Sequence, residues 1–222
     1  WEEHFHTEFG DEPRVRHRTF AWDRTDGELG RAREEFGASG YDIDESIGLV
    51  ARPDQLRHHA RESREVVVRQ LDPAPGADAE LWDAVVELQV AGRDEGHDEA
   101  GHRAFVRASL GARRVGFEST PGGAWYVAID PSSGDVAASC GIVVTDGRGR
   151  FQAVDTALAY RRRGICSRLI VDAADHSVAV HGTERFVIVA DAAYHALGLY
   201  ESLGFERAEH VVGVCRWPRD RP

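Results

Sequence analysis

The sequence predicts a mixed α/β fold, in which helices cover both faces of a central mixed sheet. Three strand-like segments between residues 124 and 157 are joined by PSSGD and DGRGR, which are turn sequences typical of antiparallel hairpins. A continuous apolar strand at 184–191 follows a helical pattern at 164–180. A helix in that place is the usual crossover between parallel strands. The sheet is therefore expected to be part antiparallel and part parallel.

The remaining elements follow from local periodicity. Apolar residues recur on adjacent helical rows in AELWDAVVELQVAGR, and at i+4 from Ile165 to Val180. A β-branched run, REVVVRQL, predicts the first strand of this domain. The expected order is a strand at 64–71, helices at 79–93 and 98–113, strands at 124–130, 136–145 and 151–157, a helix at 164–180, a strand at 184–191, a helix ending at Gly204, and a strand at 207–217.

The first 63 residues are expected to form an accessory unit, with the main domain at 64–222. The pattern predicts a small strand–helix–strand extension. Its apolar pattern echoes that of the chain's last strand–helix–strand segment, so the unit is either a degenerate half repeat or unrelated to it. The expected parts are an irregular start at 1–15, a strand at 16–23, a helix at 26–36, a strand at 46–53, and a short basic helix at 54–63.

Charge and cysteine content exclude several classes of protein. The formal net charge is −11, from 27 basic and 38 acidic residues, so the chain repels nucleic acid and anionic membranes at long range. No apolar run is long enough to span a membrane, and no secretory signal pattern is visible. The three cysteines, Cys140, Cys166 and Cys215, are too widely spaced for a disulfide framework. We expect a cytoplasmic protein without nucleic-acid or membrane partners.

A local cluster of positive charge stands out at YRRRGICSRLI, residues 160–170. Three arginines precede Gly164, and a helical pattern begins at once. A helix start presents unpaired N–H groups and the positive end of the dipole, which together suit a diphosphate. The alternative is a solvated turn. Nucleic acid would require a broader basic surface than this acidic chain offers.

The context of this cluster resembles the GNAT N-acetyltransferase family. VDTALAYRRRGICSRLIVDAA is similar to that family's acetyl-CoA motif, [RQ]-x-x-G-x-[GA], and AYHALGLYESLGFE resembles its second motif, A-x-x-L-Y-x-x-x-G-F. The resemblance covers about residues 64–217. Three positions depart from the family pattern: Cys166 replaces glycine or alanine, Ala193 replaces a frequent asparagine, and Leu158 replaces a frequent proline.

The resemblance implies a GNAT-like sheet with two splayed parallel strands and acetyl-CoA in the wedge between them. It implies an N-acetyltransferase that moves an acetyl group to a primary amine of a small molecule or peptide. A non-catalytic acyl-CoA-binding regulatory module is the alternative. The residues expected to hold the coenzyme through its pantetheine arm and pyrophosphate are Val154, Asp155, Thr156, Arg161, Arg162, Arg163, Gly164, Ile165, Cys166 and Ser167.

The resemblance also implies roles in catalysis. Tyr200 is expected to be the general acid that protonates the leaving thiolate, although it could instead pack beneath its helix. The base that accepts the amine proton is either Glu118 or Asp191. Each carboxylate also fits a surface position or a turn cap. The N-terminal unit either covers the acceptor cleft or forms a homodimer interface.

Two other kinds of site, a cysteine nucleophile and a zinc site, do not fit the sequence. At a helix start beside arginines, Cys166 is expected to have a lowered thiol pKa. A cysteine nucleophile would need an adjacent histidine, which the sequence does not supply. His97 and His102 are five residues apart and would diverge on a helix, unlike the i, i+4 pair of a zinc motif. No metal is expected.

Overall fold

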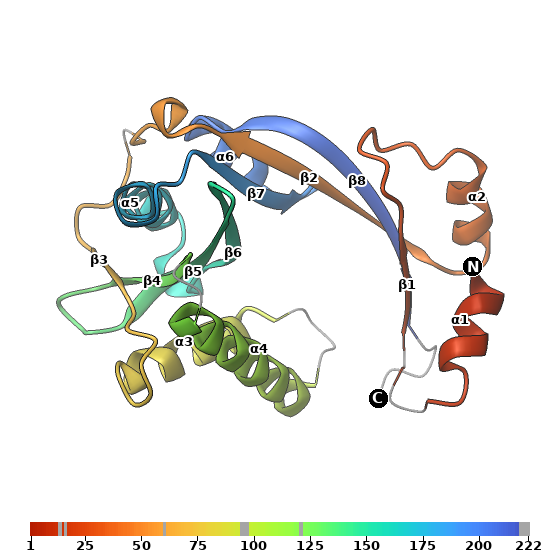
Figure 1. Cartoon of the computed structure of the whole chain (residues 1–222), viewed down its shortest axis with the longest axis horizontal. Helices are drawn as coiled ribbons and strands as arrows, with labels where there is room; N and C mark the ends of the chain where they lie inside the picture. The colour runs from red at the N-terminus through yellow and green to blue at the C-terminus, as the bar shows by residue number, and fades with distance from the viewer. Residues whose placement is uncertain (13–14, 16, 60, 94–97, 120–121, 218–222) are drawn as a thin grey trace. The chain divides into compact units, whose positions relative to one another are not determined.

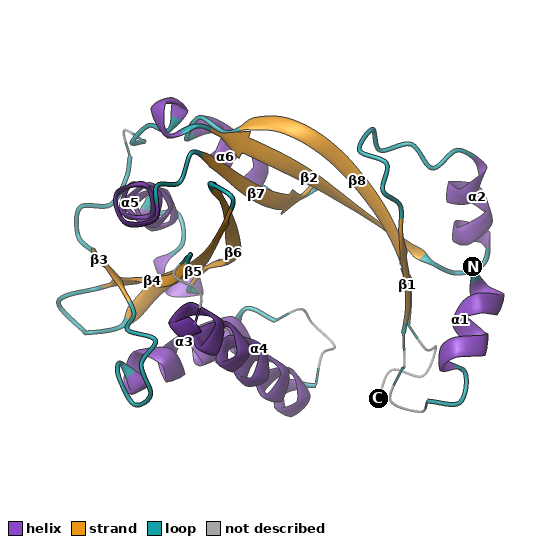
Figure 2. Cartoon of the chain, in the orientation of Figure 1, coloured by secondary structure: helices purple, strands orange, loops and turns teal. Residues whose placement is uncertain are grey.

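The computed structural model describes residues 1–12, 15, 17–59, 61–93, 98–119 and 122–217, with helices and strands distributed along the whole of this range (Figure 2). The α-helices are α1 (Glu2–Phe9), α2 (Arg31–Ala38), α3 (Ala79–Ala91), α4 (Glu99–Ser119), α5 (Ile165–His181) and α6 (Ala196–Ser202). Two short 3-10 helices are η1 (Pro53–Gln55) and η2 (Leu158–Tyr160). The strands are β1 (Arg18–Ala21), β2 (Asp42–Ala51), β3 (Val67–Gln70), β4 (Gly123–Ile129), β5 (Val136–Thr145), β6 (Arg148–Thr156), β7 (Arg185–Asp191) and β8 (Glu206–Arg216).

The strands of the described residues form one mixed sheet in the order β1-β8-β2-β7-β6-β5-β4-β3 (Figure 1). The pairs β3–β4, β4–β5 and β5–β6 are antiparallel, and β6–β7 is parallel. The mixed α/β class and the crossover through the helix after residue 164 are therefore confirmed.

The chain divides into two compact units. The larger contains residues 49–188 and 198–206, and the smaller contains residues 1–48, 189–197 and those from Arg207 onward. Strand β2 contributes residues to both units. This partition groups residues by their contacts rather than by chain order, and it differs from the predicted boundary between residues 63 and 64. The accessory unit at 1–63 therefore remains a prediction.

In the larger unit, helices cover both faces of β3–β6. Side chains along a strand point alternately to opposite faces, so a single strand packs against helices on both sides. Trp125 and Val127 of β4 pack with α3 and α4, whereas the Tyr126 ring between them meets His176 of α5, with 3.0 Å from Tyr126 Oη to His176 Nδ1. Figure 1 shows α5 on one side of these strands and α3 and α4 on the other.

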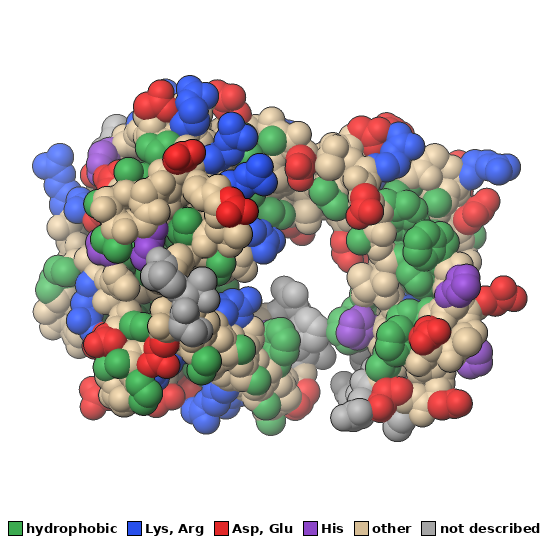
Figure 3. Space-filling model, viewed as in Figure 1, with side chains coloured by type: hydrophobic (Ala, Val, Ile, Leu, Met, Phe, Trp, Pro, Cys, Tyr) green, Lys and Arg blue, Asp and Glu red, His purple; other side chains and the backbone are tan. Residues whose placement is uncertain are grey.

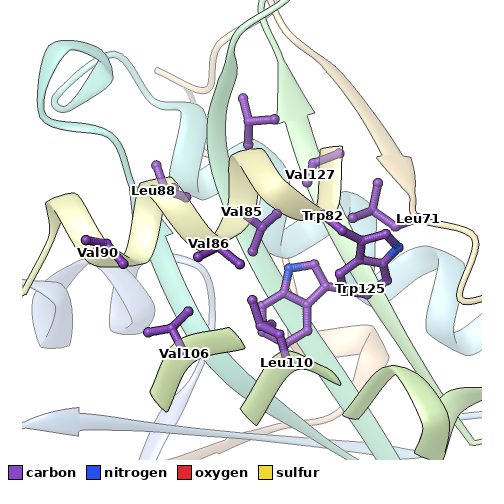
Figure 4. Packing of buried hydrophobic residues seen from close by; sticks show 11 residues of the cluster. Leu71, Trp82, Val85, Val86, Leu88, Val90, Val106, Leu110, Trp125 and Val127 are labelled. Atoms are coloured by element: carbon purple, nitrogen blue, oxygen red, sulfur yellow. The ribbon is translucent and has the colours of Figure 1, made fainter. Parts of the chain in front are cut away.

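The main core lies between α3, α4 and the sheet (Figure 4). The rings of Trp82 and Trp125 lie 6.3 Å apart at its centre. Burial of each large apolar side chain contributes about 1.5–3 kcal/mol, so this cluster fixes α3 against α4, β4 and the start of β5. The buried members are Leu71, Trp82, Val85, Val86, Leu88, Val90, Val106, Leu110, Trp125, Val127 and Val136.

The smaller unit has an aromatic core that the sequence did not predict. The ring of Phe20 lies 5.5 Å from Phe36 and 5.9 Å from both Tyr41 and Phe5. Phe5 belongs to α1, in a segment expected to be irregular. That expectation was wrong, because Trp1, Phe5 and Phe9 recur at i+4 within an otherwise polar stretch.

The basic helix expected at 54–63 is also wrong for the described residues. Only Pro53–Gln55 is helical there, as η1. Beyond it, backbone N–H groups bond to distant partners rather than along a helix: Arg57 N donates to Leu203 O at 3.1 Å, and Ser63 N donates to Gly164 O at 3.1 Å. Tertiary hydrogen bonds have replaced the local ones.

Strand β6 leaves β7 after a short parallel ladder. The paired residues are Arg148, Gly149 and Arg150 of β6 with Arg185, Phe186 and Val187 of β7. Against β5, Gln152 lies opposite Gly141 and Asp155 lies opposite Ser139, so two β6 residues face one β5 residue. This is a β-bulge, and Ala153 within it has a φ of +41°. The predicted splay of the parallel strands is thereby confirmed.

The positive φ in the bulge predicts that replacing alanine by glycine changes the free energy of unfolding in opposite directions at residue 153 and at a helical position. Ala153→Gly should raise the free energy of unfolding by about 0.5–1 kcal/mol, because glycine adopts positive φ without strain. Ala104→Gly, at an exposed position in the middle of α4, should lower it by about 1 kcal/mol. Urea unfolding of both variants measures this. A loss of stability in both would show that Ala153 is not strained.

Candidate functional site

A cleft of about 430 Å³ lies where β6 ends, between α3, the start of β5 and η2. Asp155, Thr156 and Arg161 line it, and all three were predicted coenzyme contacts. The other lining residues are Ala84, Glu87, Leu88, Ala91, Gly92, Asp135, Val136, Ala157, Leu158 and Tyr160. The remaining predicted contacts, from Val154 and from Arg162 to Ser167, lie outside this lining.

The charged lining is mainly acidic. Asp155 is half-buried, and desolvation raises the pKa of its carboxyl while the guanidinium of Arg161 partly opposes the shift. The Tyr160 hydroxyl lies 3.0 Å from the Asp135 carboxylate, and a hydrogen bond from Arg103 lowers the pKa of Glu87. A cleft with these three carboxylates favours a cationic ligand group.

The three arginines before Gly164 have different surroundings. Arg161 Nε donates to the carbonyl of Thr156 at 3.2 Å, which returns the loop to the end of β6. Arg163 pairs with Glu65 at 3.0 Å, and its guanidinium lies 5.1 Å from the Tyr160 ring centroid. Arg162 is exposed, has a φ of +62°, and has no carboxylate partner among the described residues.

The start of α5 can hold an anion. Gly164 is the N-cap with a φ of +73°, and no acidic residue lies in the first turn of this 17-residue helix. The N–H groups of Ile165, Cys166 and Ser167 therefore have no partner within the helix, and they lie at the positive end of the helix dipole. The residues present fit the diphosphate of a coenzyme. On the face drawn in Figure 3, arginine side chains elsewhere are interspersed with carboxylates.

The expected lowering of the Cys166 thiol pKa is wrong. The pKa of this thiol is raised to about 12, chiefly by burial and in part by the neighbouring Asp155 carboxylate, while a hydrogen bond with Thr156 opposes the rise. Desolvation outweighs the helix dipole here. Cys140, fully buried in β5, likewise has a raised thiol pKa because of burial. Neither thiol is an activated nucleophile.

The proposed catalytic residues occupy different environments. Tyr200 on α6 is 5% exposed, and its ring lies 6.3 Å from that of Phe205. Glu118 is exposed in the last turn of α4. Asp191 ends β7 in the smaller unit, where its Oδ1 accepts the backbone N–H of Ala193 at 2.7 Å. The structure therefore supports the turn-cap role of Asp191, and its role as base remains a prediction.

Metal-ligating clusters and membrane-spanning helices are absent from the residues that the structure covers. No group of three or more His, Cys, Asp or Glu side chains in this part of the chain could hold a metal ion. His97 lies outside the described residues, so its predicted divergence from His102 is not tested. No helix among those described is long and apolar enough to cross a membrane.

Comparison with protein families agrees with this geometry. Residues 121–207, which run from β4 to the start of β8, match the family model described as an acetyltransferase (GNAT) domain. The chain contains a GNAT acetyltransferase domain. The matched segment includes the splayed strands, the arginine loop, α5 and Tyr200. No curated protein matches the chain.

Solved structures share the fold across a greater part of the chain. A conserved protein of unknown function from Staphylococcus epidermidis has a TM-score of 0.76 at 13% identity, covering 98% of this chain and 79% of its own. A GCN5-related N-acetyltransferase from Sphaerobacter thermophilus has a TM-score of 0.70 at 18% identity, covering 100% of this chain and 67% of its own.

A third solved structure contains a bound ligand. It is a PaiA N-acetyltransferase from Thermoplasma acidophilum in complex with coenzyme A. Its TM-score is 0.52 at 12% identity, and the match covers 67% of this chain and 97% of its own. At these identities the likeness shows the fold alone, and the Sphaerobacter structure identifies that fold as GNAT.

Sequence reasoning missed most of the cleft lining. Glu87, Asp135 and Tyr160 come from three separate segments, and none belongs to either GNAT motif. Tyr160 offered the one available signal, because it directly precedes the arginines. Glu87 had no such signal, since an exposed glutamate on an amphipathic helix is ordinary.

The raised pKa of Asp155 predicts a pH-dependent gain in stability on neutralisation. The folded carboxyl has a higher pKa than the unfolded one, so its ionised form lowers stability above that pKa. Asp155→Asn should therefore raise the melting temperature at pH 7, and the gain should shrink as the pH falls through the folded pKa. Asp23→Asn, which removes an exposed carboxylate, is the control for net charge. Equal gains in both variants would contradict the prediction.

The raised pKa of Cys166 predicts slow alkylation in the folded protein. With a pKa of about 12, roughly one thiol in ten thousand is ionised at pH 8, against about a quarter for an ordinary cysteine. Iodoacetamide labelling followed by peptide mass spectrometry should therefore modify Cys166 only after unfolding in guanidinium. Rapid labelling of the native protein would show an accessible thiolate.

Proposed function

We propose that the protein is an acetyl-CoA-dependent N-acetyltransferase whose acceptor is a primary amine on a small molecule or peptide. One observation carries the proposal: β6 leaves β7 after Arg150 and leads directly into the arginine loop and the start of α5. This arrangement offers an open strand edge for an extended arm, followed by a seat for the diphosphate at the end of that arm.

The predicted coenzyme contacts divide between these two parts. Backbone groups of Val154, Asp155 and Thr156 would pair with the pantetheine arm as an added strand. N–H groups from Arg162 to Ser167 would bind the diphosphate, with arginine side chains adding charge-assisted hydrogen bonds. The coenzyme supplies a thioester-bound acetyl group. A backbone N–H at the open edge of β6 would polarise its carbonyl.

The acceptor is a cationic amine that must lose a proton before it attacks. The acidic cleft lined by Glu87, Asp135 and Asp155 supports this class of acceptor, because it concentrates cations near the end of β6. Glu118 or Asp191 takes the proton directly or through water. Tyr200 donates a proton to the departing thiolate. Its burial beside Phe205 limits its side chain to few orientations.

The second candidate is a non-catalytic acyl-CoA-binding regulatory module. The exposure of Glu118 and the backbone contact of Asp191 favour it, because neither carboxylate is held in a geometry particular to proton transfer. Coenzyme binding is common to both candidates, and thiol release distinguishes them.

Thiol release from acetyl-CoA across an amine panel tests the proposal. The panel contains polyamines, aminoglycosides, amino acids and peptide N-termini. We expect at least one class to release thiol, and we expect Tyr200→Phe to lower kcat by about 10²–10⁴ while coenzyme affinity stays unchanged. Tyr194→Phe is the matched control, because Tyr194 is 46% exposed.

The possible outcomes separate the candidates. Coenzyme binding without thiol release for any amine would favour the regulatory module. No binding of acetyl-CoA by calorimetry would reject both candidates. Full turnover by Tyr200→Phe would reject the acid assignment alone.

A further inference from the structure

The segment that begins at the last residue of η1 contacts both GNAT motifs of the chain. We call residues 55–59 and 61–63 the strap. It was expected to be part of a short basic helix, yet backbone groups near its two ends bond to the turn after α6 and to the start of α5. All of these contacts lie within the larger unit.

The first end of the strap is held by the turn that follows the helix of Tyr200. Arg57 N donates to Leu203 O at 3.1 Å, and Gln55 Nε2 donates to Glu206 Oε1 at 2.8 Å. Gly204, between these partners, has a φ of +101°, and a Cβ there would overlap the carbonyl oxygen of Gln55. The strap backbone therefore occupies the space that a side chain at this position would fill.

The other end of the strap is held by the first residue of the diphosphate seat. Ser63 N donates to Gly164 O at 3.1 Å, and the same carbonyl accepts Arg168 N at 3.2 Å. A Cβ on Gly164 would overlap the carbonyl oxygen of Arg61. The missing side chain of Gly164 thus accommodates the backbone of the strap.

Side chains strengthen this second attachment. The Glu62 side chain is 13% exposed and lies between His58 Nδ1, at 2.8 Å, and Arg168 Nη1, at 3.8 Å. Arg168 also binds Asp172 one turn further along α5, at 2.6 Å. The first two turns of α5 are therefore tied to the strap by both backbone and charged groups.

We propose that the strap is the positioning element of the coenzyme seat and couples it to the helix that carries Tyr200. The inference rests on the proposed function, because it assigns the seat to a coenzyme diphosphate. The physical reason is preorganisation. N–H groups bind a diphosphate strongly only if the loop backbone is already fixed, and the strap fixes the carbonyl of the seat's N-cap residue.

The coupling is tested with a substitution far from the seat. Gly204→Ala displaces the strap at Gln55 without touching the diphosphate, and we expect it to weaken coenzyme A binding at least about tenfold by calorimetry. Gly182→Ala is the matched control. Gly182 also has a positive φ, of +63°, but a Cβ there meets nothing within 4 Å, so the strap is untouched. We expect its affinity for coenzyme A to match that of the wild type.

Hydrogen exchange of the wild-type protein gives a second reading that requires no variant to fold. Addition of coenzyme A should slow exchange of the amides of Arg57 and Ser63, although neither is expected to contact the ligand. Unchanged exchange at both amides in a protein that binds coenzyme A would overturn the strap proposal and leave the proposed function intact. Equal weakening in Gly204→Ala and Gly182→Ala would also overturn it. Failure of the wild-type protein to bind coenzyme A would instead reject the proposed function and, with it, the role of the strap.

Discussion

The departure of β6 from β7 is the constraint on which the candidate site depends. Parallel strands pair evenly along their length unless something interrupts them, and here the extra residue at Ala153 bends β6 away after three paired positions. The bend leaves the backbone of residues 151–156 bonded to β5 alone within the described ladder. An open edge of this kind inside a sheet is costly unless a ligand or water satisfies it, which is why such bulges occur beside binding sites.

Two opposing electrostatic effects shape the site. The start of α5 and the arginine loop are positive, whereas the cleft at the end of β6 contains Glu87, Asp135 and Asp155. An anionic group and a cationic group therefore have separate and oppositely charged places to bind.

In the same region, the effect of burial on the thiol pKa is larger than that of the helix dipole. The dipole favours the thiolate of Cys166, yet removal of water raises its pKa to about 12.

The strap links the motifs that sequence comparison treats separately. Gly164 and Gly204 lie forty residues apart in the chain, and each lacks a side chain where a carbonyl of the strap passes. Glycine at such positions is commonly explained by a local turn, but here it is also required because a side chain would overlap the backbone of a distant segment. The segment before residue 64 is thus part of the architecture of the GNAT domain, even though the family model begins at residue 121.

The sequence by itself determined the fold class, the order of the elements from residue 64 onward, and the GNAT motifs at Arg161–Cys166 and Ala196–Phe205. Those features depend on local periodicity and on residue types at fixed spacing, which a single chain displays directly. The tertiary structure alone decided the path of residues 55–59 and 61–63, the acidic lining from α3 and from the turn before β5, and the raised pKa of Cys166. Each depends on which groups, distant in the sequence, approach one another and exclude water. The strap does not form the expected helix, because its backbone N–H groups donate to the carbonyl oxygens of Leu203 and Gly164 instead of to its own turns.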